Sequence, residues 1–127
     1  MMPSTLINGG IDPALRELVA RYEGRVCLLA LPHHRHNQAV EATAWFVASE
    51  GLTNATKHAS HADVTIYAAC EEGSLRIIVC DNGPGGATLA GSGLRGLADR
   101  VDACGGELQL TSLPSHGTEL IALLPCV

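Results

Sequence analysis

Hydrophobic residues in the middle of the chain recur at helical spacing and divide one predicted helix into two unlike faces. The segment from residue 37 to residue 60 contains no proline. Its apolar positions follow one line, three or four residues apart: Ala44, Ala48, Leu52, Ala55 and Ala59, with Trp45 beside it. Glu50, Asn54, Lys57 and His58 fall together on the opposite side. Such a polar face is ordinarily exposed to solvent. This face, however, carries a carboxylate, an amide, an ammonium and an imidazole group, which are able to bind a ligand or take part in catalysis.

Periodic and alternating apolar positions predict the remaining elements. We predict helices at residues 12–23, 37–60 and 94–104 and strands at residues 25–31, 63–70, 75–81, 107–111 and 118–124. The strands at 63–70 and 75–81 flank a short polar turn, which is typical of a β-hairpin. Because the helices are segregated from a mostly antiparallel sheet, we predict an α+β fold with one domain, a two-layer α/β sandwich.

Length and composition narrow the possible functions. A chain of 127 residues makes about one domain, which we place at residues 11–127, after a disordered or vector-derived start at residues 1–10. Eight Lys and Arg against thirteen Asp and Glu form no basic stripe, so we expect no nucleic acid partner. No apolar run approaches the roughly 18 residues of a membrane span, so we expect this piece not to be membrane-inserted.

Five cysteines and a histidine-rich segment raise the question of a metal site. The cysteines are odd in number and widely spaced without a Cys-x-x-Cys pair, which argues against a zinc site and a disulfide framework and favours free thiols. His33, His34 and His36 have no carboxylate or thiolate companion nearby in the sequence, and exposure in a loop explains them equally well. We therefore do not predict a metal site at this segment.

Asp81 closes the apolar column of the strand at residues 75–81. Leu75, Ile77 and Val79 precede it at alternate positions, so its side chain should lie on the core-facing side of the sheet. A carboxylate there needs a hydrogen-bond donor. That donor is either the amine of a ligand or a backbone amide of the following turn, and the sequence leaves both open.

Glycines crowd the segment after Asp81 and suit the close approach of a backbone to a ligand. The sequence DNGPGG occupies residues 81–86, and Gly91 and Gly93 precede a helix whose first amides are free to hold phosphate oxygens. GSGLRG at residues 91–96 matches the glycine pattern of dinucleotide-binding folds, but it follows a loop and not the first strand of a βαβ unit. The chain also has no P-loop motif, so a nucleotide would be held in another way.

Four motifs in order resemble those of the ATPase domain of histidine kinases, in the wider group that includes gyrase and the mismatch-repair ATPases. EGLTNATKHA at residues 50–59 resembles the N box, DNGPG at 81–85 and GSGLRG at 91–96 the glycine boxes, and the pair at 117–118 the last motif. GLRGLADRV at 93–101 resembles the short-lid subfamily, whose response regulators carry helix-turn-helix domains. The resemblance covers about the last two-thirds of the chain and implies the Bergerat fold, a mixed, mostly antiparallel sheet covered on one face by helices.

The resemblance implies ATP and Mg²⁺ as ligands and assigns the polar face of the central helix to the phosphate end. Glu50 would be the acid that assists phosphoryl transfer, and Asn54 would bind Mg²⁺. Lys57 and His58 would face the phosphates.

The same resemblance assigns the adenine end and the loops. Asp81 would accept a hydrogen bond from the exocyclic amine of adenine, and Thr118 would support that end of the site. Gly83 and Gly85 would let the loop wrap the base. Three further positions would hold the phosphates: Gly91, Gly93 and Leu94.

Partners also follow from the resemblance. The family transfers the γ-phosphoryl group of ATP to a histidine on a separate dimerisation domain of the parent kinase, and a response regulator is served indirectly. Nothing before Glu50 resembles that domain, so we expect a cytoplasmic domain that binds ATP without phosphorylating itself, whether or not the parent has an inner-membrane anchor. Two alternatives stay open: a relative of the anti-sigma factor serine kinases, and a nucleotide-sensing module without transferase activity.

Overall fold

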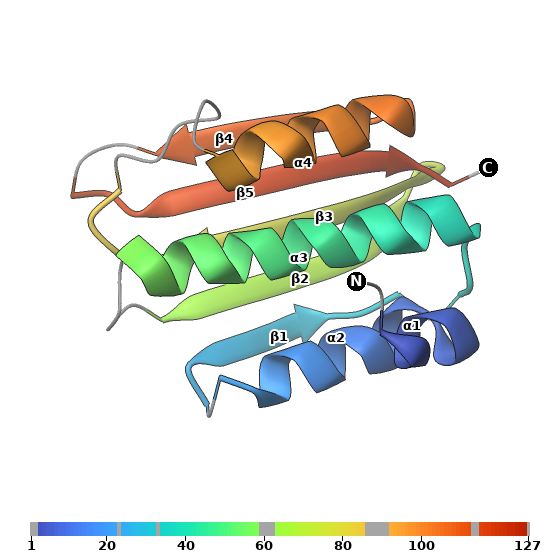
Figure 1. The fold of residues 1–127 in the computed structure, drawn as a ribbon, viewed down its shortest axis with the longest axis horizontal. Coiled ribbons are helices and arrows are strands. Elements are labelled where there is room, and N and C mark those ends of the chain that lie inside the picture. Colours follow the sequence, from blue (N-terminus) through green and yellow to red (C-terminus); the bar gives the residue numbers. More distant parts are fainter. Residues whose placement is uncertain are drawn as a thin grey trace.

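Helices cover one face of a five-stranded sheet (Figure 1). The computed structural model describes residues 3–22, 24–32, 34–58, 63–85, 92–112 and 115–126. The helices are α1 (Ser4–Gly9), α2 (Ile11–Ala20), α3 (Gln38–His58) and α4 (Ser92–Ala103). The strands are β1 (Val26–Ala30), β2 (Val64–Glu71), β3 (Ser74–Asp81), β4 (Glu107–Ser112) and β5 (Thr118–Pro125). All eight predicted elements are present, with boundaries that differ by at most three residues.

The sheet is mixed but mostly antiparallel. Its strand order is β1-β2-β3-β5-β4, with β1 parallel to β2 and every other neighbouring pair antiparallel. The predicted hairpin is formed by β2 and β3, and its two turn residues, Glu72 and Gly73, have φ values of 50° and 79°. Positive φ at both central residues suits the right-handed twist of the flanking strands. The predicted α+β sandwich is therefore confirmed.

Alternate residues of the strands pack against the helices to form the core. On β3, Leu75, Ile77 and Val79 are at most 3% exposed, and on β5 the buried positions are again alternate ones. Helix α3 lies along the middle of the sheet, nearly parallel to its strands, and contacts both β3 and β5 (Figure 1). The apolar line predicted on α3 is buried at its described positions, with Leu52 fully so; Ala59 lies outside the described residues. Burial of one such side chain stabilises the fold by about 1.5–3 kcal/mol.

The start of the chain differs from the sequence-based expectation. Residues 4–9 form helix α1, where we expected a disordered or vector-derived start, and Leu6 is only 2% exposed, so this segment is not disordered. A six-residue helix is too short to be stable alone, so this contact of Leu6 with the core accounts for its order. Among the described residues, no helix combines the length and the apolar character needed to cross a bilayer.

An ion pair between a half-exposed arginine and a buried glutamate fixes the loop before α3. Glu41, in the first turn of that helix, is 2% exposed, and its two carboxylate oxygens accept hydrogen bonds from Nε and Nη2 of Arg35 at 3.0 and 3.1 Å. The backbone N–H of His36 donates to Oε2 of Glu41 at 3.2 Å. Asn37 then caps α3, since its Oδ1 accepts a hydrogen bond from the backbone N–H of Val40 at 2.9 Å. Sequence periodicity gave no sign of this network.

Candidate nucleotide-binding site

Helix α3 approaches strand β3 closely because Gly51 has no side chain. A β-carbon at this position would lie 2.9 Å from Cγ1 of Val79, closer than packed carbon atoms come. The helix and the strand run in the same direction (Figure 1). One helical turn beyond Gly51 lies Asn54, about 5 Å farther along the axis, and two residues beyond Val79 lies Asp81, about 7 Å farther along the strand. The close contact therefore brings Asn54 and Asp81 to the same end of the sheet.

The polar face predicted on α3 is open at this end. Glu50 and Asn54 are partly exposed, and Lys57 is exposed. Glu50 and Asn54 are four residues apart, so their side chains lie one above the other on the helix surface. His58 is the last residue of α3, and its side chain lies outside the described part of the structure.

Asp81 is the last residue of β3 and caps the turn that follows it. Its Oδ1 accepts a hydrogen bond from the backbone N–H of Gly83 at 2.9 Å. The turn-capping role that the sequence left open is therefore present. Asp81 lies on the predicted helix-facing side, but it is only partly buried. Within the described part of the chain this is the contact that its carboxylate makes, so Oδ2 remains available to a second donor such as a ligand amine.

Thr118 lies directly beside Asp81. The two residues are paired across β3 and β5, and both belong to the helix-facing side of the sheet. The Thr118 hydroxyl is 2.7 Å from the hydroxyl of Ser112 on β4, where either group can be the donor. Gly117 has φ +74°, and a β-carbon there would overlap the carbonyl oxygen of Asp81. The Gly117-Thr118 pair thus lets β5 begin in close contact with the end of β3.

The loop after Asp81 is tied to both of its neighbours. The backbone N–H of Asp63 donates to Oδ1 of Asn82 at 2.8 Å, which holds the loop at the start of β2. The backbone N–H of Ser115 donates to the carbonyl oxygen of Pro84 at 2.6 Å, which holds it beside the connection from β4 to β5. Gly85 has φ +74°, a conformation that favours glycine. The sequence did not reveal the roles of Asn82 and Ser115, because each forms its hydrogen bond with a backbone group of a residue far away along the chain, Asp63 and Pro84 respectively.

The second glycine motif leads into α4. Gly93 is the second residue of this helix, and the first amides of a helix have no intrahelical acceptor, so they can hold an anion. The side chain of Leu94 is buried at 4% exposure, so only its backbone could contact a phosphate. Gly91 lies outside the described residues.

These groups match the needs of a nucleotide with a hard metal ion. Asp81 offers an acceptor for an amine, the glycines at 83 and 85 offer accessible backbone, and the start of α4 offers amides. The amide oxygen of Asn54 and the carboxylate of Glu50 are hard oxygen ligands of the kind that Mg²⁺ prefers. The individual site roles stay predictions at this point.

A small pocket elsewhere in the structure is too small to hold a nucleotide. Its volume is about 120 Å³, well below the roughly 300–1,000 Å³ of pockets that enclose small-molecule ligands. It lies near the start of α3, and these residues line it: Leu6, Ile7, Arg35, His36, Gln38 and Glu41.

Comparison with known proteins identified sensor kinases. The chain matches no protein-family model. It is 32% identical over 113 residues to the signal transduction histidine-protein kinase/phosphatase UhpB of Salmonella typhimurium, over 87% of this chain and 21% of that protein. It is 27% identical over 125 residues to the kinase/phosphatase DegS of Brevibacillus brevis, over 91% of this chain and 32% of that protein. The chain therefore spans about a fifth to a third of these relatives.

Solved structures agree on the fold. The blue-light activated histidine kinase EL346 of Erythrobacter litoralis matches 91% of this chain with a TM-score of 0.76 and 22% identity, over 42% of that chain. The ATP-binding domain of PrrB from Mycobacterium tuberculosis matches 92% of this chain and 91% of its own, with a TM-score of 0.64 and 23% identity. The homologues of this chain are sensor histidine kinases, and its fold is that of their ATP-binding domain.

Proposed function

We propose that this chain is the ATP-binding catalytic domain of a two-component sensor histidine kinase. The observation that supports this most is the meeting of three separate motifs at one end of the sheet: the polar face of α3, the Asp81 turn, and Thr118, paired with Asp81 across the strands. The sensor kinases among its relatives favour this function over a serine kinase of the anti-sigma type or a nucleotide sensor without transferase activity.

Adenine would bind at the end of β3. The free oxygen of Asp81 would accept a hydrogen bond from the exocyclic amine, while its other oxygen stays with Gly83. Thr118 would support the same end, and Gly83 and Gly85 would let the loop approach the base. One structural neighbour, ShkA, was determined in complex with AMPPNP and matches 87% of this chain with a TM-score of 0.70 and 20% identity, over 29% of that chain.

The phosphates would lie between the end of α3 and the start of α4. Backbone amides at Gly91, Gly93 and Leu94 would donate to phosphate oxygens, with Lys57 and His58 as further donors. Asn54 would bind Mg²⁺ through its amide oxygen. The ion supplies positive charge that neutralises the phosphates during transfer.

Glu50 would assist the transfer itself. It lies one turn before Asn54 on the same face of α3, so both would face the γ-phosphoryl group. Its carboxylate would accept the N–H of the incoming imidazole and so orient the attacking nitrogen. Phosphoryl transfer asks the protein chiefly for such positioning and charge neutralisation.

The acceptor histidine would belong to a dimerisation domain of the parent kinase, outside this chain. His34 and His36 lie in the loop before α3 and not on a helix. We therefore propose that the isolated chain binds ATP without phosphorylating itself and that a response regulator is served indirectly. We place the domain in the cytoplasm, and we assign the kinase to the short-lid subfamily on its GLRGLADRV segment.

A transfer assay tests this function. Labelled ATP, the chain and a separately supplied histidine-bearing dimerisation domain should yield acid-labile phosphohistidine. Glu50→Gln should reduce transfer at least tenfold without loss of nucleotide binding, whereas Glu107→Gln, an exposed carboxylate on β4, should leave both unchanged. Acid-stable phosphoserine on a partner protein would favour the serine kinase, and nucleotide binding without transfer to any acceptor would favour the sensor.

A further inference from the structure

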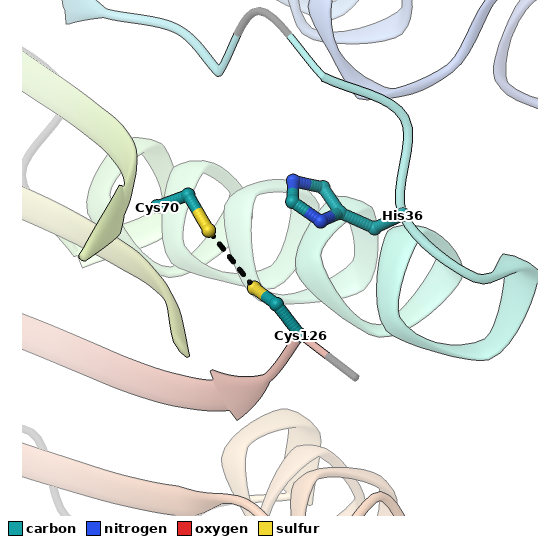
Figure 2. A group of neighbouring side chains, drawn as sticks. All are labelled: His36, Cys70 and Cys126. Atoms are coloured by element: carbon teal, nitrogen blue, oxygen red, sulfur yellow. Dashed lines mark hydrogen bonds between the residues drawn. The ribbon is translucent and has the colours of Figure 1, made fainter. Parts of the chain in front are cut away.

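Three metal-ligating side chains from distant parts of the chain meet at the end of the sheet opposite the proposed nucleotide site. Sγ of Cys70 lies 3.3 Å from Sγ of Cys126, although 56 residues separate them in the sequence. Each of these sulfurs and one ring nitrogen of His36 lie within 4.8 Å of one another. Figure 2 shows the imidazole ring beside the two thiols, one near the end of β2 and the other just after β5, two strands that are separated by β3 in the sheet. His36 lies just before Gln38, the first residue of α3, and Asn54 lies 16 residues farther, about 24 Å along the helix axis.

The sheet places the two cysteines. Cys70 is paired with Leu75 across the hairpin, and Leu75 is paired with Leu124 of β5. Cys126 follows two residues after Leu124, just past the end of β5. Its backbone N–H donates to the carbonyl oxygen of Gly73 in the hairpin turn at 2.7 Å. Backbone hydrogen bonds therefore fix the backbone of both cysteines, while the side chains keep freedom to rotate.

The network at the start of α3 places His36. The backbone N–H of this residue is bound to the buried carboxylate of Glu41, and the next residue, Asn37, caps the helix. Arg35 holds Glu41 from the other side through two hydrogen bonds. The backbone on both sides of His36 is thus fixed, which limits the positions that its imidazole can take.

The imidazole has an unused buried atom. Nε2 of His36 is buried, and among the described residues it has no hydrogen-bond partner. Buried polar atoms in proteins are nearly always paired, and an exception calls for a cause such as a bound ion. A ring nitrogen held near two sulfurs is what a metal ion would require.

We propose that His36, Cys70 and Cys126 bind one thiophilic metal ion, Zn²⁺ or Cu⁺. Thiolate and imidazole are the ligands that both ions prefer. At Zn–S bonds of about 2.3 Å and tetrahedral angles, two sulfurs lie about 3.8 Å apart. The present 3.3 Å separation needs to open by about half an ångström, which the exposed side chain of Cys70 permits. Binding releases the thiol protons to solvent and oxidises nothing.

This proposal departs from the sequence-based expectation. The sequence predicts no metal site at the histidine segment, because no thiolate lies near it along the chain. The wide spacing of the cysteines likewise argues against a zinc site. The structure supplies two thiols from the ends of β2 and β5, which no local motif could reveal. A disulfide between Cys70 and Cys126 would need the sulfurs to close to about 2.05 Å, and an oxidised pair would not bind the ion.

Metal titration of the full chain tests the proposal. The chain is stripped of metal, kept anaerobic with a non-thiol reductant, and titrated with Zn²⁺ and, separately, with Cu⁺ against a chromogenic chelator of each. We expect one equivalent of at least one ion to bind per chain. Co²⁺ in place of Zn²⁺ should give thiolate-to-cobalt charge-transfer absorption.

Variants identify the ligands. Cys70→Ser, Cys126→Ser and His36→Gln should each weaken binding at least tenfold, whereas Cys27→Ser, an exposed thiol on β1, should leave the affinity unchanged. Far-ultraviolet circular dichroism checks that each variant is folded. The proposal is overturned if neither ion binds one to one, or if Cys70→Ser and Cys126→Ser bind as tightly as the unaltered chain. It is equally overturned if the reduced chain binds neither ion and air oxidation links Cys70 to Cys126, as peptide mapping would show.

Discussion

Gly51→Ala tests the close contact that brings α3 to the end of β3. Alanine is favoured over glycine in a helix interior by about 1 kcal/mol. Against this gain, the new methyl group would lie 2.9 Å from Cγ1 and 3.1 Å from Cγ2 of Val79. The β-branched side chain of Val79 has little freedom to turn away, and overpacking of this kind costs about 1–3 kcal/mol. The free energy of unfolding should therefore fall by about 0–2 kcal/mol.

Gly96→Ala on α4 is the matched control. It makes the same substitution inside a helix, but among the described residues no atom outside the adjoining residues and the backbone of the helix itself lies within 4 Å of the new methyl group. This variant should be more stable than the unaltered chain by about 1 kcal/mol. The difference between the two variants, about 1–3 kcal/mol, isolates the contact with Val79 because the change in helix propensity cancels.

Urea unfolding gives the free energy of unfolding of both variants. The slope of this free energy with urea concentration should be the same in all proteins, so that only the midpoint changes. In a Val79→Ala background Cγ1 and Cγ2 are gone, whereas Cβ, 3.0 Å from the new methyl group, remains. The cost of Gly51→Ala should therefore be smaller there than in the unaltered chain, and the two substitutions should be coupled. Equal stabilisation by Gly51→Ala and Gly96→Ala would show that a methyl group at position 51 fits between α3 and β3, which would contradict the close contact with Val79.

Three further predictions follow. Asp81→Asn keeps an oxygen for the Gly83 amide but loses the charge, so the affinity for an ATP analogue should fall by about 1–3 kcal/mol in calorimetry; unchanged affinity would remove Asp81 from the adenine role. Glu41→Ala removes three hydrogen bonds, while the half-exposed Arg35 can regain contact with water, which limits the cost. The free energy of unfolding in urea should therefore fall by about 1–3 kcal/mol. A loss near zero would contradict this. Burial, with the hydrogen bond to Glu119, raises the pKa of Cys80 to about 11 from 9.0, so stability present below pH 9 should be lost as pH rises toward 11; in urea unfolding across this range Cys80→Ala should lessen the loss, and an identical loss would contradict it.

The main elements could be predicted because their patterns are local. The buried line of α3, the alternation on β3 and the punctuation by glycine and proline all lie within single segments. The same locality explains the site residues, since Glu50 and Asn54 share a helix face and Asp81 ends an apolar column. The roles of these residues in ATP binding came from the resemblance, and they remain to be tested.

Features that depend on distant contacts could not be predicted. Helix α1 is too short to carry a periodic signal, and the burial of Leu6 becomes visible only with the rest of the core in place. The cluster of His36, Cys70 and Cys126 depends on strand register and on the network around Glu41. The pairing of β3 with β5 and the contact of Arg35 with the buried Glu41 both join segments that no single local pattern connects.

Calorimetric titration with a non-hydrolysable ATP analogue tests whether this chain binds ATP with Mg²⁺ through Asn54. The chain, Asn54→Ala and Thr53→Ala, a neighbouring exposed residue of α3, are each titrated with and without Mg²⁺. We expect saturable binding that Mg²⁺ strengthens in the unaltered chain and in Thr53→Ala but not in Asn54→Ala. Absence of binding at millimolar nucleotide, or an equal effect of Mg²⁺ on all three proteins, would contradict this expectation.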